Sequence, residues 1–334
     1  MAQGTGRMID VVPKKRRKKL SKNRSLLWLL LLVGTVANAN PSPAHQQILV
    51  SIKPIKLLVE LLNDPLRQHS IDIEVSTLLP QGSTPHDYVL KPSDISKVLK
   101  ADLLVWMGPV VEPYLTPIVA RVDKAKVIDV SQLQGLLRLP VRPLLEMAGK
   151  ASGQHDDDHH QGHSQTHNHQ GMAFDPHVWW SLSNARLIAE EVMSYLASDV
   201  IPQDNNRLDA VFLPMNDLLA KKRNQAKTQQ PSFMLFHDGL HYVEEDLGVT
   251  SVARVALGDE LRTGIKTLLA LKQRVLDAKV VCVVAEPNTN VDILGKIEGE
   301  SPLRVERVDS LGWDVESYQD MLSHVYEVLL GCRI

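Results

Sequence analysis

The sequence predicts an α/β protein with two lobes, each a mostly parallel sheet flanked by helices. The chain has 334 residues, which is more than one ordinary hydrophobic core accommodates. Strand-like and helix-like segments alternate in both halves, as expected of parallel sheets. Between the halves, a helical stretch from 205 to 228 is long enough to join two lobes.

The first half alternates short apolar runs with helical patterns. Strands are expected at 48–52, 71–79, 103–107 and 127–130, and helices at 54–63 and 93–101. The run 103–107 is continuously apolar, which is typical of a strand buried on both faces. Ser93 is the expected N-cap of its helix.

The second half resumes the alternation after a polar interruption. Helices are expected at 182–196, 205–228 and 316–330, and strands at 232–236, 252–255, 280–285 and 305–308. Pro214 lies inside the long helical stretch and is expected to kink or split it. The predicted N-terminal lobe is 40–204, the linking helix 205–228 and the C-terminal lobe 229–334.

The first 39 residues have the pattern of a secretory signal peptide. A basic run from Lys14 to Arg24 precedes an apolar stretch from Leu26 to Val36, and Ala37-Asn38-Ala39 supplies a small-x-small cleavage site. We expect export through the Sec pathway to the periplasm, with cleavage near Ala39. A basic patch beside a buried helix is the alternative.

Removing this segment changes the charge of the chain. Residues 1–39 hold nine of the 37 Lys and Arg residues and one of the 39 acidic residues, so the remainder has a net charge of −10. An acidic chain disfavours nucleic acid as a partner and suits a cationic ligand.

Three histidines directly follow predicted strands or lie in loops beyond them: His86, His177 and His237. Ligands of open α/β sheets gather beyond the carboxyl ends of the strands, so these side chains are expected to converge. Three neutral imidazoles with one open position describe a zinc site. Magnesium and calcium prefer oxygen ligands, and manganese sites usually contain more carboxylate.

The fourth position has two equal candidates, Asp309 and water. Asp309 comes just after the last predicted strand. His241 is near enough to His237 in sequence to join the site, although we expect it on the next helical turn.

Each of the three histidines has a neighbouring carboxylate: Asp87, Asp175 and Asp238. Metal-bound imidazoles commonly donate their second N–H to such a group, which fixes the tautomer. Capping of the following turn is the alternative role.

A polar segment from 151 to 171 interrupts the α/β pattern. It is rich in His and Asp, cannot form a core, and is predicted to be a mobile loop that binds several cations weakly. Its candidate auxiliary ligands are His155, His159, His160, His163, His167 and His169.

Two cysteines, Cys282 and Cys332, remain in an exported chain, which indicates a disulfide. It would join the C-terminal tail to a core strand. Two buried free thiols are the alternative.

Six segments carry a family resemblance. They are Ser51-Ile52-Lys53-Pro54, Gly82 to Tyr88 with the following Lys91-Pro92-Ser93-Asp94, Asp175-Pro176-His177-Val178-Trp179, Phe236-His237-Asp238, Ala285-Glu286-Pro287 and Val308-Asp309-Ser310-Leu311-Gly312. Together they resemble the solute-binding proteins of zinc and manganese ABC importers, and specifically the zinc (ZnuA) type, over almost the whole mature chain.

The resemblance implies a long rigid helix between the lobes and a metal ion in the interlobe cleft. It implies His86, His177 and His237 as ligands, with Asp309 at the fourth position. Manganese-type relatives are expected to have Glu where this chain has His237, so the substitution favours zinc.

Further features compare with the zinc-type relatives. The His- and Asp-rich insertion is typical of them, and Cys282 and Cys332 look like the disulfide of that subgroup. Pro85 stands where some of these relatives have Glu, and His241 where a small residue is usual. Pro85 means that the auxiliary carboxylate of those relatives is missing, and His241 raises the prospect of an altered coordination shell.

The expected function is therefore non-enzymatic. The chain would bind Zn²⁺ as cargo in the periplasm, as a monomer, and deliver it to inner-membrane ABC permease subunits. A periplasmic metallochaperone is a further candidate partner. A manganese-, iron- or nickel-binding member of the same family is the main alternative. A zinc hydrolase is disfavoured because the sequence has no HExxH helix or nucleophile elbow.

Overall fold

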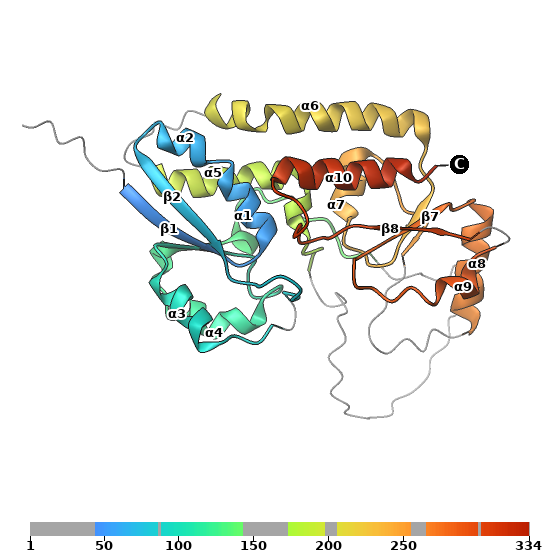
Figure 1. The fold of residues 1–334 in the computed structure, drawn as a ribbon, viewed down its shortest axis with the longest axis horizontal. Helices are drawn as coiled ribbons and strands as arrows, with labels where there is room; N and C mark the ends of the chain where they lie inside the picture. Colours follow the sequence, from blue (N-terminus) through green and yellow to red (C-terminus); the bar gives the residue numbers. More distant parts are fainter. Residues whose placement is uncertain are drawn as a thin grey trace, which may run out of the picture. The chain divides into compact units, whose positions relative to one another are not determined.

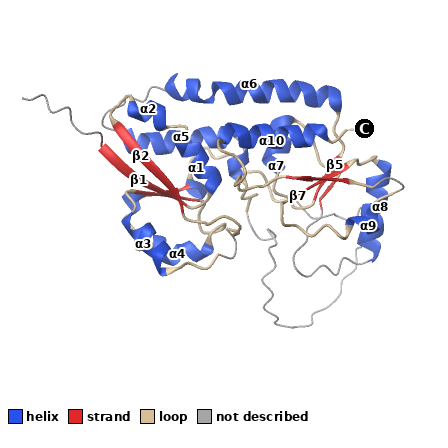
Figure 2. Ribbon diagram, viewed as in Figure 1, coloured by secondary structure: helices blue, strands red, loops and turns tan. Residues whose placement is uncertain are grey.

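The protein is described here by a computed structural model covering residues 44–85, 88–142, 173–197, 206–254, 265–299 and 302–333. Within these ranges, the strands form two four-stranded sheets with helices packed on them (Figures 1 and 2). The two-lobe parallel α/β prediction is confirmed.

The first sheet has the order β2-β1-β3-β4 and is parallel throughout. Its strands are β1 (Ala44–Val50), β2 (Ile71–Thr77), β3 (Leu103–Trp106) and β4 (Val127–Asp129). All four residues of β3 are buried, in agreement with its continuous apolar pattern. The helices of this part are α1 (Lys53–Glu60), α2 (Asn63–Arg67), α3 (Pro92–Lys100), α4 (Thr116–Val119) and α5 (Leu182–Ala197).

The second sheet has the order β6-β5-β7-β8 and is also parallel. Its strands are β5 (Phe233–Leu235), β6 (Ala253–Arg254), β7 (Cys282–Ala285) and β8 (Arg304–Arg307). The helices that follow the long connection are α7 (His241–Leu247), α8 (Ile265–Asp277), α9 (Leu294–Ile297) and α10 (Tyr318–Gly331). Strand order is thus the same in both sheets, a repeat that the sequence did not reveal.

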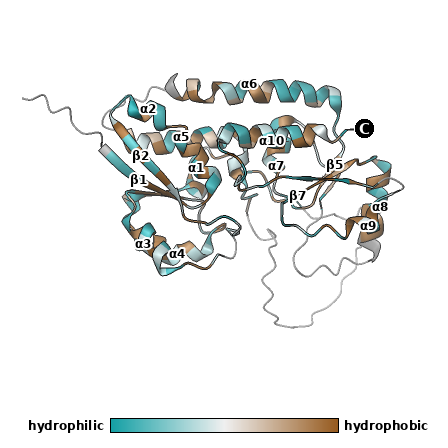
Figure 3. Ribbon diagram, viewed as in Figure 1, coloured by the Kyte–Doolittle hydropathy of each residue, from teal (hydrophilic) through white to brown (hydrophobic). Residues whose placement is uncertain are grey.

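The long helix α6 (Asn206–Gln229) packs against α5, α7 and α10 (Figure 1). Its buried positions Leu208, Phe212, Met215 and Leu219 recur every three or four residues, so one face is covered. Figure 3 shows the corresponding alternation of hydrophobic and hydrophilic residues around this helix. Pro214 lies on the exposed face, and α6 is assigned as one continuous helix, so the predicted split does not occur.

The start of α3 also differs from the prediction. The N-cap is Lys91 and not Ser93, because Pro92 occupies the first turn, where its missing N–H costs nothing. Asp94 Oδ2 accepts the backbone N–H of Lys91 at 3.0 Å, which closes the helix end.

The predicted disulfide between Cys282 and Cys332 is present, with the two Cα atoms 5.5 Å apart. Cys282 is the first residue of β7, and Cys332 follows α10. The backbone N–H of Ser232 also donates to the carbonyl of Cys332 at 2.8 Å. The C-terminal helix is therefore fixed covalently to the second sheet.

Candidate metal site

His177 is held by the carboxylate of Asp175. Oδ1 of Asp175 accepts the backbone N–H of His177 at 2.9 Å and lies 2.7 Å from its Nδ1. An ionised carboxylate only accepts, so Nδ1 carries the proton, and in the neutral ring Nε2 has the lone pair. Burial lowers the pKa of His177, but the charge and hydrogen bond of Asp175 outweigh it and the pKa is raised. The predicted hydrogen bond from the second ring nitrogen to the neighbouring carboxylate is thus present for His177.

His237 meets His177 from the other sheet. It stands in the loop between β5 and α7, and its Nε2 lies 3.3 Å from Nε2 of His177. The two rings are 5.1 Å apart and steeply inclined, at 75°. Burial lowers the pKa of His237, and so does the neighbouring His177, which keeps its imidazole neutral near pH 7.

The distance between these two nitrogens fits a shared ion. Zinc lies about 2.0–2.1 Å from imidazole nitrogen in tetrahedral sites, so two ligands on one ion are separated by about 3.3–3.4 Å. The observed 3.3 Å matches that tetrahedral edge. Two residues 60 positions apart therefore stand at the spacing that neighbouring ligands of one small cation require.

Gly239 makes this approach possible. A Cβ at this position would lie 2.9 Å from Cδ2 of His237 and 3.5 Å from Nε2 of His177. The first distance is shorter than any ordinary carbon contact, so a side chain here would displace the His237 ring.

The expected role of Asp238 beside His237 is not observed. Asp238 pairs instead with Arg142, which contacts both of its carboxylate oxygens. The same guanidinium reaches Glu244 Oε2 at 2.5 Å, and Arg254 lies 3.7 Å from Asp238. A buried carboxylate is stabilised more by a guanidinium than by a neutral imidazole, so Asp238 anchors the segment before the His-rich insertion.

His241 lies beside Asp175, with its Nδ1 3.7 Å from Oδ2. It is the first residue of α7, as the expected next helical turn requires. Burial and the positive charge of Arg142 lower its pKa. The two oxygens of Asp175 thus face different histidines.

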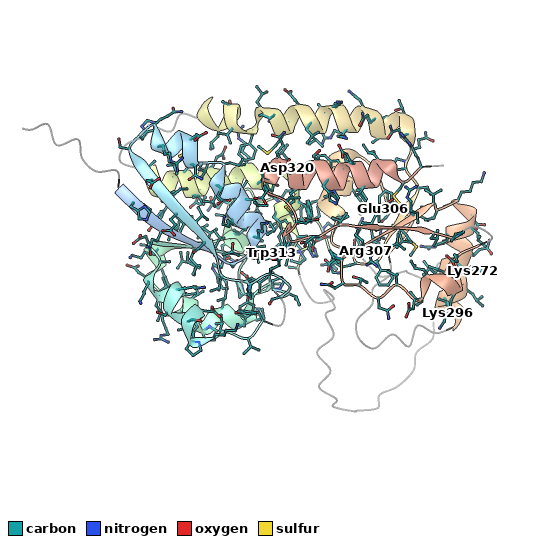
Figure 4. All side chains as sticks on the ribbon, viewed as in Figure 1. Lys272, Lys296, Glu306, Arg307, Trp313 and Asp320 are labelled. Atoms are coloured by element: carbon teal, nitrogen blue, oxygen red, sulfur yellow. A yellow bond between two sulfur atoms is a disulfide. The ribbon has the colours of Figure 1, made fainter. Side chains whose placement is uncertain are left out.

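Asp309 follows β8, and its carboxylate is engaged within its own turn. Oδ1 accepts the N–H of Leu311 at 2.9 Å, and Oδ2 accepts the N–H of Trp313 at 2.8 Å. From the preceding half of the chain, Lys53 Nζ donates to the carbonyls of Trp313 and Val315, and Trp179 donates to that of Ser310. Trp313 is labelled in Figure 4.

His86 and Asp87 lie outside the described residues, as do the six histidines of the insertion. Among the side chains that are described, no group of three His, Cys, Asp or Glu residues is placed to hold a metal ion. Of the predicted ligands, the structure therefore brings together His177 and His237.

Two residues near the histidine pair were given no role by sequence reasoning. Glu286 follows β7 at the carboxyl edge of the sheet, a position that could have drawn attention to it. Arg142 has no such signal, since its partner Asp238 is 96 residues away.

Two parallel sheets and a pair of facing imidazoles beyond their strands define a metal-binding protein of the two-lobe, solute-binding class. The family described as ZnuA, zinc-uptake complex component A, periplasmic, matches residues 48–332, and the chain belongs to this family. Its members are transport components, so the chain is not an enzyme, as the sequence indicated.

Relatives and solved structures agree with this family. The high-affinity zinc uptake system protein ZnuA of Yersinia pestis is 28% identical over 334 residues, covering 94% of this chain and 99% of the relative. ZnuA of Haemophilus ducreyi is 28% identical and covers 93% and 98%. A crystal structure of ZnuA superimposes with a TM-score of 0.65 at 21% identity, covering 86% of this chain and 99% of the other. The Zn(II)-bound ZnuA-like domain of Streptococcus pneumoniae AdcA gives 0.60 at 18%, covering 87% and 99%.

Within the part of the chain that the structure describes, no helix combines the length and the apolar character needed to cross a bilayer.

Proposed function

We propose that the chain binds Zn²⁺ in the periplasm and delivers it to the permease of an ABC-type zinc importer. The observation that carries the proposal is the 3.3 Å separation of Nε2 of His177 and Nε2 of His237, which suits two ligands of one tetrahedral ion. Family membership and the zinc-uptake names of the relatives support the same cargo.

The proposed ligands are His86, His177 and His237. In sequence, His86 comes after β2 and before α3, and ligands of open α/β sheets gather beyond the carboxyl ends of the strands. For the fourth position, Asp309 and water remain the alternatives from the sequence. The two backbone hydrogen bonds on the Asp309 carboxylate favour water in the described conformation.

The remaining expectations form part of the same proposal. Residues 1–39 act as a signal peptide, the lobes comprise 40–204 and 229–334 on either side of the helix at 205–228, and the mature protein acts as a monomer. The histidines of the 151–171 insertion collect zinc weakly and raise its local concentration near the tight site. A periplasmic metallochaperone is a candidate donor.

Competitive titration tests the proposal. The metal-free mature chain is titrated with Zn²⁺ and Mn²⁺ against a chromophoric chelator, alongside His86→Ala and a deletion of residues 155–169. We expect one tight zinc equivalent that His86→Ala abolishes and that the deletion retains, while the deletion removes weaker sites. Preference for Mn²⁺, or a tight site that does not respond to His86→Ala, contradicts the proposal.

A further inference from the structure

A small cavity adjoins the histidine pair on the side of the second sheet. Its lining includes His237, Gly239, Glu286 and Ser310, and its volume is about 20 Å³. That is room for roughly one water molecule. Gly239 lines the cavity, and a Cβ placed on it would lie within 3.5 Å of both imidazoles, so the cavity adjoins the site of the proposed ion.

Glu286 is the one acidic residue among the described residues that line this space. Its Oε1 accepts the hydroxyl of Ser310 at 2.6 Å. Its backbone carbonyl accepts from Arg307 at 2.6 Å, and the same guanidinium reaches the carbonyl of Thr289 at 3.1 Å. Figure 4 labels Arg307 at the end of β8. The backbone and the side chain of Glu286 are therefore both held in place. None of the described residues donates a hydrogen bond to its Oε2.

Asp309 does not face the same space. Its neighbours Val308 and Ser310 line the cavity, whereas Asp309 does not, and its two carboxylate oxygens close the turn toward Leu311 and Trp313. The carboxylate expected from the sequence is thus engaged in its own turn and does not line the cavity.

The charge of Glu286 reaches both imidazoles. Burial lowers the pKa of His237, and Glu286 opposes this more strongly than Asp238 does. The pKa of His177 is dominated by burial and Asp175, with Glu286 again acting in the raising direction. A carboxylate so placed stabilises any positive charge held between the rings.

We propose that Glu286 is the positioning residue for the ion's fourth ligand: a water molecule in this cavity completes the zinc shell and donates a hydrogen bond to the Glu286 carboxylate. This inference rests on the proposed function. Direct ligation is disfavoured because Glu286 does not form a metal-holding group with the two histidines in the described conformation. A negative charge next to the water compensates the ion without adding a bond that must be broken on delivery.

The test compares Zn²⁺ affinity and the Co²⁺ optical spectrum of the metal-stripped mature chain with those of Glu286→Gln. The matched control is Glu306→Gln, which removes the same charge from β8; Glu306 is labelled in Figure 4. Among the described residues, Glu306 forms an ion pair only with Arg304, at 2.5 Å. We expect the dissociation constant for zinc to rise about 10- to 100-fold in Glu286→Gln and to stay within about twofold in the control. Thiocyanate should displace the metal-bound water of the Co²⁺ form more readily in Glu286→Gln.

Two further variants keep the test decisive. Ser310→Ala removes the hydrogen bond that orients Glu286 and should weaken zinc binding several-fold even if Glu286→Gln folds poorly. Asp309→Asn should lower thermal stability but leave zinc affinity nearly unchanged. Wild-type affinity in both Glu286→Gln and Ser310→Ala overturns the inference, as does a loss carried by Asp309→Asn or a Glu286 oxygen bound directly to the metal. Failure of the proposed function would instead appear as the absence of a tight zinc site in the wild-type chain.

Discussion

Nδ1 of His177 lies 2.7 Å from Oδ1 of Asp175, and the same oxygen accepts the backbone N–H of His177. This carboxylate fixes both the position and the tautomer of a buried imidazole, leaving Nε2 to face His237. The orientation of the proposed ligand is therefore built before any ion arrives.

Asp175→Asn is expected to weaken zinc binding about 10- to 100-fold at pH 7.5, because an amide neither fixes the tautomer nor supplies charge. In the wild type, Asp175 raises the pKa of His177, so protons should compete with zinc as the pH falls through that raised value. Without the carboxylate the pKa falls, and the loss of affinity should begin at lower pH. Zinc dissociation constants measured from pH 8 to 5.5 test both effects.

The control for this variant is Asp72→Asn, which removes a surface carboxylate that pairs with Arg67 and His45. It should leave both the affinity and its pH dependence unchanged. An Asp175→Asn protein with wild-type affinity at every pH would show that the contact has no role in ligation.

Gly239→Ala should weaken zinc binding at least tenfold. The new methyl group would lie 2.9 Å from the His237 ring, so the ring must move away from Nε2 of His177. Gly331→Ala is the matched control, since a Cβ there meets nothing within 4 Å. Calorimetric titration of both variants measures the difference, and equal affinities would contradict this account of the close approach.

The sheets were predictable because their signals are local. The apolar run of β3 (Leu103–Trp106) is the pattern of a doubly buried strand, and its burial does not depend on details of distant residues. The convergence of His177 and His237 could be predicted because ligands of open α/β sheets gather beyond the carboxyl ends of the strands, and each half of the chain supplies one of these histidines there. The boundary at Ser93 failed because Pro92 competes for the first turn of the same helix.

The carboxylates could not be assigned in the same way. Whether Asp238 contacts His237 or Arg142 is decided by a residue 96 positions away. Whether Asp309 faces the ion depends on how its turn closes on Trp313, which is itself held by Lys53 from the first half of the chain. The orientations of these carboxylates are set by contacts with residues far away in the sequence, so the spacing of residues along the chain does not reveal them.

Lys53→Met should lower the free energy of unfolding by about 1–3 kcal/mol, because Lys53 makes two charge-assisted hydrogen bonds to the Trp313 and Val315 carbonyls. It also places its ammonium 5.5 Å from the centre of the Trp313 ring. Lys56→Met breaks only the i,i+4 pair with Glu60 and should change stability by less than about 0.5 kcal/mol. Urea unfolding of both variants tests the contrast. Similar free energies of unfolding would show that the hydrogen bonds of Lys53 do not stabilise the fold.

Removal of the disulfide should lower stability without affecting zinc affinity. The bond between Cys282 and Cys332 closes a loop of 50 residues, for which the chain-entropy estimate is about 4 kcal/mol, with about 2–4 kcal/mol usual in practice. The double variant Cys282→Ala/Cys332→Ala should therefore unfold at lower urea concentration and be insensitive to reductant. Zinc titration at pH 7.5 should give the wild-type value, and a large loss of affinity would mean that the bond also shapes the site.

Glu112 gives the chain a pH-dependent stability that is separate from metal binding. Its side chain is fully buried after β3, where Oε2 accepts the N–H of Met107 at 2.8 Å and Tyr114 donates to Oε1 at 3.4 Å. Burial raises the pKa of Glu112 from its ordinary value of 4.5 to about 7. The folded state thus holds this proton more tightly than the unfolded chain does.

The contribution of Glu112 to stability is therefore complete below about pH 4.5 and is lost as the pH rises through about 7. Between pH 5 and pH 8 the loss should be roughly 2–3 kcal/mol. Glu112→Gln keeps an oxygen for Met107 but cannot ionise, so its stability should fall less over this interval by about that amount. Metal-free protein unfolded in urea at both pH values measures the difference, with the surface change Glu60→Gln as the control. Parallel pH profiles for wild type and Glu112→Gln would show that the buried carboxyl is not the group responsible.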